Sequence, residues 1–275
     1  MAIKKMMEIR TERKKINLLI ITSFLFMWSC SHKIKVRTPS ARFISPEAQS
    51  DTLDGEFSVY YAPGARAELD LKNGKADNAL SVYNEPKNAF FDSIGLSGDI
   101  GIVKDLDLLL LSNGKDTPIL VGLKYQILGK SRKIAKKGDH SLALSYAGGT
   151  SSKTDEDGED LELTPQDEDT KVELDLESTD ASLIYGYRFS NTQLIYSGIS
   201  YTKSKFSGVL ESQNSSLNNQ KVKYKATITG AHIGYLSYIS KSGSFKAELS
   251  GQKVKWTNTD EQTFGFFSMG FGIHW

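Results

Sequence analysis

The sequence predicts an all-β chain folded as an antiparallel, up-and-down transmembrane β-barrel of about ten strands. Apolar and polar residues alternate with a period of two over most of residues 55–275, and helical periodicity is weak there. Several of these runs, of which 55–71 is the longest, exceed the usual strand length of about 5–6 residues in soluble proteins. The loops between the runs alternate between short and long, as in membrane barrels.

Composition excludes several other classes of protein. The chain has 275 residues, a formal net charge of +1 and one cysteine. Its mean hydropathy of −0.34 excludes a multi-helix membrane protein. The balanced charge gives no support for a nucleic-acid-binding protein. A single cysteine excludes an intramolecular disulfide and a thiolate metal cluster.

The N-terminus has the pattern of an export signal, predicted over residues 1–29. Residues 1–15 carry six bases against two acids, and a mostly apolar run from Ile16 to Trp28 follows. This run is short for a membrane-spanning helix, although a retained N-terminal anchor is the alternative interpretation. Small Ser29 precedes Cys30, which resembles the lipobox of bacterial lipoproteins and implies acylation of Cys30; the alternative is a cysteine removed with the signal. Residues 30–54 are polar, contain two prolines and are interpreted as a periplasmic linker.

The barrel is expected over residues 55–275, with one face of each strand turned to lipid. The first run, 55–71, contains Pro63 on its apolar parity, which predicts a local break there. The later strands are expected, in order, around 94–102, 106–110, 119–127, 142–146, 183–189, 192–208, 222–230, 245–251 and 267–275. Val172, Leu174 and Leu176 also alternate with acids, so a strand is expected to extend beyond the membrane there. The change of parity between Leu176 and Leu183 predicts a β-bulge.

Loop lengths orient the predicted barrel. Short connections are expected at 104–105, 190–191, 240–243 and 129–139, and longer ones at 72–90, 151–180 and 211–221. Outer-membrane barrels have short periplasmic turns and longer outer loops, so both termini are expected on the periplasmic side. Alternation alone also fits a soluble β-sandwich or barrel whose apolar face points inward.

The end of the chain resembles the C-terminal signature of Gram-negative outer-membrane β-barrel proteins. Residues 263–275 alternate apolar positions and end on an aromatic residue. The resemblance covers about residues 55–275 at the level of pattern and implies residence in outer-membrane lipid. It also implies recognition by the barrel-assembly machinery through Phe267, Met269, Phe271, Ile273 and Trp275.

The polar face of the strands predicts a charged lumen. The expected inward charges are Arg66, Glu68, Asp70, Asp99, Asp107, Lys124, Arg188, Lys246 and Glu248. A ten-stranded barrel is narrow, because open aqueous pores belong to barrels of about 16 strands. Mixed charges in so narrow a space are expected to pair and plug it, since a buried unpaired charge is costly. A selectivity ring for a small solute is the alternative.

No catalytic, cofactor-binding or metal-ligating residues are assigned from the sequence. The four histidines, His32, His140, His232 and His274, have no metal-ligand spacing. Omptin proteases are ten-stranded barrels with Asp-Asp and Asp-His pairs, but no Asp-x-His occurs here. No local motif supports a Ser-His-Asn site of the outer-membrane phospholipase type.

An acidic outer loop is predicted over residues 151–180, which hold 13 acids against two lysines. Asp155, Asp157 and Glu159 have the spacing of an EF-hand loop, but Asp160 stands where that loop needs glycine. The interpretation is a solvated, self-repelling loop. Loose binding of Ca²⁺ or Mg²⁺, or attraction of a basic partner, is the alternative.

The functional hypothesis is an outer-membrane barrel with a structural or surface-interaction role and no enzymatic activity. Two alternatives stay open at this point. One is a narrow channel for small solutes, and the other is a periplasmic β-protein carried by a lipid on Cys30.

Overall fold

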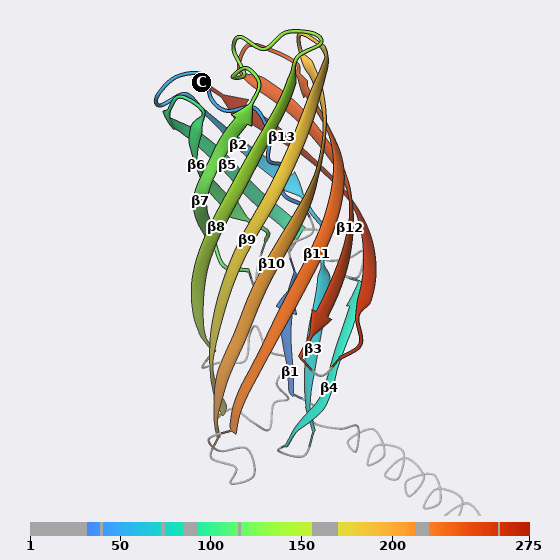
Figure 1. The fold of residues 1–275 in the computed structure, drawn as a ribbon. Helices are drawn as coiled ribbons and strands as arrows, with labels where there is room; N and C mark the ends of the chain where they lie inside the picture. Colours follow the sequence, from blue (N-terminus) through green and yellow to red (C-terminus); the bar gives the residue numbers. More distant parts are fainter. Residues whose placement is uncertain are drawn as a thin grey trace, which may run out of the picture.

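The computed structural model describes residues 32–38, 41–72, 75–84, 93–114, 117–155, 170–212, 220–257 and 259–275. Within these residues, ten antiparallel strands form a closed barrel, and three further strands form a separate sheet (Figure 1). The predicted signal peptide 1–29 and the acylation of Cys30 concern residues outside the described part of the chain, so both stay predictions.

The barrel confirms the predicted up-and-down fold of about ten strands. Each strand pairs with its neighbour along the chain, except that β2 pairs directly with β5, and β13 returns to β2 to close the wall. The wall consists of β2 (Gly55–Tyr61), β5 (Ile94–Val103), β6 (Leu106–Ser112), β7 (Leu120–Leu128), β8 (His140–Asp155), β9 (Thr170–Ser190), β10 (Gln193–Ser212), β11 (Gln220–Tyr238), β12 (Gly243–Trp256) and β13 (Gln262–His274).

The last residue helps to fasten the seam between the first and last strands of the wall. The backbone N–H of Trp275 donates to the carbonyl of Gly55 at 3.2 Å. Its indole Nε1 donates to the carbonyl of Leu53 at 3.0 Å. Closure also needs a small residue at Gly270, because a Cβ atom there would lie 2.5 Å from the Cβ atom of Tyr60.

The run 55–71 is not one strand of the wall. Strand β2 ends at Tyr61, and after a break that contains Pro63 the chain enters β3 (Ala65–Lys72). Strand β3 pairs with β1 (His32–Arg37) on one side and with β4 (Lys75–Asn84) on the other. We call this sheet of β1, β3 and β4 the outer sheet. Arg66, Glu68 and Asp70 therefore belong to the outer sheet and not to the barrel wall, where the alternation places them. A break at Pro63 is expected from the sequence, but a change of sheet is not.

An apolar band surrounds the outside of the barrel. Large apolar side chains on alternate positions face outward, among them Leu108 (40% exposed), Val121 (52%), Leu144 (49%), Ile199 (62%), Ile233 (53%) and Phe271 (62%). The intervening side chains face the interior and are mostly polar or small. This is the arrangement of a transmembrane β-barrel of the outer-membrane type. Within the described residues, no helix is long and apolar enough to cross a membrane.

The short turns identify the periplasmic end of the barrel. Gly55 and Trp275 meet at the end that carries the turns 104–105, 129–139, 191–192 and 239–242. The opposite, outer end carries the longer connections, including β3 and β4 (Figure 1). Both ends of the wall therefore lie at the short-turn end, which is the periplasmic end in outer-membrane barrels.

The bulge predicted between Leu176 and Leu183 of β9 is absent. The register stays continuous there, and the surroundings of the outer face change from water to lipid instead. Strand β9 pairs with β8 and β10 in continuous register past Leu176 and Leu183. Leu174 and Leu176 are buried on the inner face, whereas Leu183 points outward to lipid. Beyond the membrane the outer face meets water, so apolar side chains turn inward. The inner apolar side chains at this level are Leu174, Leu176, Phe206, Tyr224, Ala226, Ile228, Val254 and Trp256.

We predict different costs for the same substitution at two outward positions of β8. Leu144→Arg places a charge within the apolar band and should lower the free energy of unfolding by about 2–4 kcal/mol. Thr150→Arg lies on the same face beyond the band and should cost less than about 1 kcal/mol. Urea unfolding of the two variants in lipid vesicles, followed by tryptophan fluorescence, measures both values. Equal losses would contradict the assigned position of the membrane.

Candidate functional site in the barrel lumen

Residues 41–50 run through the lumen of the barrel. All of residues 41–49 are buried, and residue 50 is partly exposed. Before this stretch, the backbone N–H of Thr38 bonds to Ala65 of the outer sheet at 2.9 Å. At its end, the carbonyl of Ala48 accepts a bond of 3.0 Å from the N–H of Arg132, in the periplasmic turn 129–139. This luminal segment, 41–50, is therefore not the exposed periplasmic linker that the sequence predicts over residues 30–54.

Arg42 anchors the middle of the luminal segment. Its guanidinium donates to Asp180 of β9, with Nη2 and Oδ2 2.6 Å apart, and Nη2 also lies 2.7 Å from Oγ1 of Thr202. Both charged side chains are 4% exposed. The carboxylate of Glu248, on β12, accepts the backbone N–H groups of Arg42 and Phe43 at 3.2 Å each. A charged wall residue is thereby satisfied by the backbone of the segment.

Glu47 makes the second ion pair, nearer the periplasmic end. Its two carboxylate oxygens each lie 2.6 Å from a guanidinium nitrogen of Arg188 on β9, in a bidentate geometry. Both side chains are 2% exposed. Arg188 also donates to the backbone carbonyls of Asn191 and Arg132. This guanidinium therefore joins the luminal segment to two periplasmic turns.

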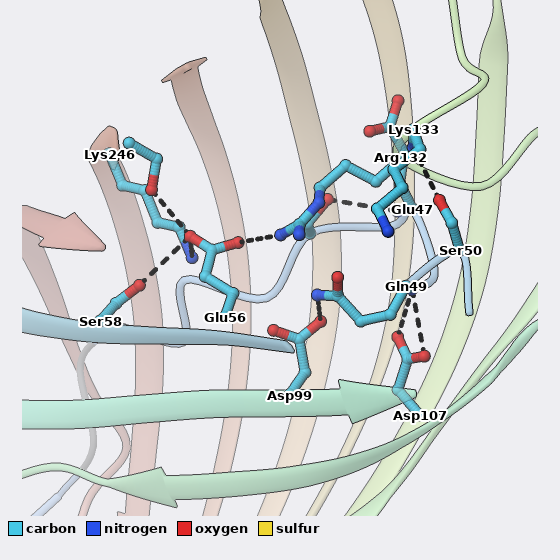
Figure 2. Close-up of polar contacts among 12 residues, drawn as sticks. Glu47, Gln49, Ser50, Glu56, Ser58, Asp99, Asp107, Arg132, Lys133 and Lys246 are labelled. Atoms are coloured by element: carbon cyan, nitrogen blue, oxygen red, sulfur yellow. Dashed lines mark hydrogen bonds and ion pairs between the residues drawn. The ribbon is translucent and has the colours of Figure 1, made fainter. Parts of the chain in front are cut away.

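Lys124 lies between two wall carboxylates beside the segment. Its Nζ atom is 2.7 Å from Asp99 and 3.0 Å from Asp107, and it also donates to the carbonyl of Glu47 at 3.0 Å. Gln49 bonds to the same two carboxylates, through its side-chain amide to Asp99 at 2.8 Å and through its backbone N–H to Asp107 at 3.1 Å (Figure 2). One amine and one glutamine therefore satisfy both acids.

Glu56 forms the centre of a third cluster, near the periplasmic rim. Lys246 lies 2.9 Å from its carboxylate, Arg132 lies 3.4 Å away, and the hydroxyl of Ser244 donates to it at 2.8 Å. Figure 2 shows Glu56 between Lys246 and Arg132, which come from opposite sides of the lumen. Arg132 belongs to the turn 129–139, so this cluster links the turn to the wall.

Apolar contacts fill the space between the ion pairs. Ile44 belongs to a buried cluster with Leu109, Leu111, Leu120, Ala147, Ile184, Leu194, Tyr196 and Leu236. The ring of Phe43 lies 4.8 Å from the ring of Tyr60. The wall leaves room for the segment at Gly186, where a Cβ atom would lie 2.6 Å from Cγ of Pro46. The segment is thus packed as core.

Hydrogen bonds fix the segment where it leaves the lumen. The N–H of Lys133 donates to Oγ of Ser50 at 2.8 Å, and its Nζ lies 2.6 Å from the carboxylate of Asp54. The bond to Asp54 raises the pKa of Lys133. Because Lys133 is half exposed, this contact contributes little to stability compared with the buried pairs. In the same turn, the N–H of Lys136 helps to hold the pKa of Asp139 below its usual value.

The structure brings six of the nine expected lumen charges to the inner face of the wall. They are Asp99, Asp107, Lys124, Arg188, Lys246 and Glu248. Sequence reasoning missed Glu56 and Asp180, although both lie on a polar parity. It also missed Arg42, Glu47 and Gln49, because an irregular segment carries no periodicity that shows which residues are buried.

At the level of the segment, the charges that line the lumen are buried. A water-filled channel would leave its lining charges accessible, yet Asp107 and Lys124 are 0% exposed and Glu248 is 2% exposed. Among the described residues, no group of three or more His, Cys, Asp or Glu is arranged to hold a metal ion. The site holds a segment of the chain in place through matched charges.

The histidines lie in four separate places. His32 is on β1, in the outer sheet. His140 contacts the hydroxyl of Tyr185 at 2.5 Å near the periplasmic end. His232 is buried with its ring 6.0 Å from that of Tyr196, and His274 meets the ring of Tyr238 edge-on at 5.5 Å. They do not form one cluster.

No protein-family model and no curated protein matches the chain. It is similar to the solved structure of Ail, the attachment invasion locus protein of Yersinia pestis, in complex with the heparin analogue sucrose octasulfate. The identity is 11%, the match covers 82% of this chain and 99% of that one, and the TM-score is 0.38. Neisserial surface protein A is also similar, with 13% identity, 80% of this chain and 96% of that one covered, and a TM-score of 0.35. A third similar structure is the outer membrane protease OmpT from Escherichia coli, with 9% identity, 89% of this chain and 94% of that one covered, and a TM-score of 0.37.

We predict that Glu47 and Arg188 are strongly coupled. Glu47→Ala or Arg188→Ala alone leaves a buried charge without its partner and should lower the free energy of unfolding by about 3–5 kcal/mol. The double variant should lose less than the sum, because neither charge remains. Chemical unfolding of the refolded barrel gives the three values.

An exposed pair supplies the control for this cycle. Lys205 and Glu177 lie 2.8 Å apart, with side chains 52% and 50% exposed. Glu177→Ala should cost less than about 1 kcal/mol. Additive losses for Glu47 and Arg188, or losses as small as that of the control, would show that the luminal pair is not coupled.

Proposed function

We propose that this outer-membrane barrel has a structural and surface-interaction role, without enzymatic activity, and that its lumen is sealed by the luminal segment 41–50. The observation that carries the proposal is the matched set of buried contacts between this segment and the wall. Arg42 with Asp180 and Glu47 with Arg188 are the two ion pairs that tie the segment to the strands.

The cost of removing the segment supports a sealed barrel over a narrow solute channel. Withdrawal of residues 41–50 would remove the ion-pair partners of Asp180 and Arg188 and two of the hydrogen-bond donors to Glu248. Breaking one buried pair costs about 3–5 kcal/mol, and two such pairs would be lost together. Water entering the emptied lumen would recover part of this cost.

The uneven height of the wall supports a role at the outer surface. Strands β9, β10 and β11 have 21, 20 and 19 residues, whereas β2 and β6 have 7 each. The long strands extend past the apolar band at the outer end, where β4 also contacts β11 (Figure 1). An apolar interior above the membrane makes this extension a stable support for contacts with other molecules.

The acidic face of β9 belongs to the same proposal. Glu173, Asp175 and Glu177 point outward above the band, next to the predicted acidic loop. Residues 156–169 of that loop lie outside the described part of the chain. We propose that the loop is solvated and that it attracts divalent cations or a basic partner.

The end of β13 supports recognition during assembly. Phe267, Met269, Phe271, Ile273 and Trp275 are all exposed on the outward face, at 42–62%. Side chains that face lipid in the folded barrel are accessible to an assembly factor before insertion. We propose that the barrel-assembly machinery recognises this row.

We predict that the wild-type protein shows no conductance steps in a planar lipid bilayer. A variant that lacks residues 32–50 should show them, because the luminal segment is gone and wall charges then face water. A heat-dependent shift on gels establishes that each protein is folded. Steps from the wild type would contradict the sealed lumen. A folded deletion variant without steps would show that other residues seal it.

A further inference from the structure

Seven lysines face outward from β10, β11 and β12, near the outer end of the barrel. Along β10, the outward positions run from Ile195 through Ile199 and Tyr201 and then change to Lys203 and Lys205. Strands β11 and β12 make the same change. We call this set the lysine face; it comprises Lys203, Lys205, Lys221, Lys223, Lys225, Lys253 and Lys255. It starts where the apolar band ends, at the level expected for the headgroups of the outer leaflet.

The described part of the protein neutralises the lysine face only in part. Lys205 pairs across the sheet with Lys225, and Lys203 and Lys255 flank Thr227 from its two neighbouring strands. Like charges directly opposite each other destabilise a sheet. Among the described residues, two of the seven lysines have a carboxylate partner, which is Glu177 for Lys205 and Glu261 for Lys253. The remaining positive charge favours a negative group from outside the chain.

A shallow groove lies on the lipid-facing wall, next to these lysines on their periplasmic side. Ala231, Gly251 and Gly265 pair with one another across β11, β12 and β13. Larger side chains, including Ile233, Leu249 and Phe267, border them. The groove has a volume of about 650 Å³. A Cβ atom added at Gly251 would meet nothing within 4 Å, so the neighbouring side chains leave this space to the membrane.

We propose that β10–β13 bind an outer-leaflet lipid with a phosphorylated headgroup. The phosphates lie against the lysine face, and an acyl chain lies in the groove at Gly251. On β12 the two parts of the site are adjacent, because Gly251 is followed on the same face by Lys253 and Lys255. A lysine near an anionic membrane surface is attracted to it, and this attraction falls with salt.

The test compares two triple variants of the full chain, refolded in detergent micelles. Lys203→Gln/Lys225→Gln/Lys255→Gln removes three charges from the lysine face. Lys136→Gln/Lys137→Gln/Lys241→Gln removes three exposed charges from the periplasmic turns and is the matched control. Fluorescence anisotropy of labelled diphosphoryl lipid A reports binding, with dephosphorylated lipid A as the second probe. A heat shift on gels verifies folding.

The proposal expects the lysine-face variant to bind diphosphoryl lipid A at least about tenfold more weakly than the wild type at low salt, with little change for the control. High salt and removal of the phosphates should each reduce the difference. Equal weakening in both triple variants, or an unchanged difference with dephosphorylated lipid A, would overturn it. The wild type could instead bind a soluble sulfated polysaccharide more tightly than lipid A, and the lysine-face variant could lose that binding. This result would also overturn the proposal, because the ligand would then be a polysaccharide.

The groove is tested separately. Gly251→Leu places a side chain in the space that the acyl chain occupies, and the folded wall has room for it. This variant should bind diphosphoryl lipid A more weakly, yet bind inorganic phosphate as the wild type does. Unchanged affinity for lipid A would remove the groove from the site.

Discussion

The structure depends on the rule that charges inside a narrow barrel need partners. Ten strands enclose a narrow lumen, and most charges on its inner face are buried. The wall does not satisfy them alone: Asp180, Arg188 and Glu248 bond to the segment 41–50. The segment brings a guanidinium, a carboxylate and backbone N–H groups to the positions where these three residues need them.

The same contacts relate the two ends of the barrel. The luminal segment follows the outer sheet, in which β1 pairs with β3, and it leads directly into β2 at the periplasmic rim. It therefore spans the lumen lengthwise between two structures that it also connects by sequence. Hydrogen bonds from Arg132 and Lys133 fix its periplasmic end, and the hydrogen bond from Thr38 to Ala65 fixes the chain just before it. A change in the segment would consequently affect both mouths of the barrel.

The sequence predicts the wall well because each wall strand meets two different environments, and its alternation records them. It predicts the luminal segment poorly, because an irregular chain buried by charge pairing has the same composition as an exposed linker. Arg42 and Glu47 show the difficulty: each has its partner more than a hundred residues away, on β9. The sheet of β3 is missed for a related reason. Its alternation continues that of β2, and the direction of the chain after Pro63 depends on pairing with β1.

Strand β9 shows that a face of a strand cannot be assigned to the inside or the outside from its polarity alone. Leu176 and Leu183 have opposite parity, and both are placed favourably without a bulge, because the outer face passes from water to lipid between them. Polarity must therefore invert at the membrane border on every strand that crosses it. On β10 and β12 the same border separates Tyr201 from Lys203 and Gly251 from Lys253. Because β9, which flanks the lysine face, and β10 and β12, which belong to it, all change at this level, the charges follow the border of the membrane and not the local sequence of one strand.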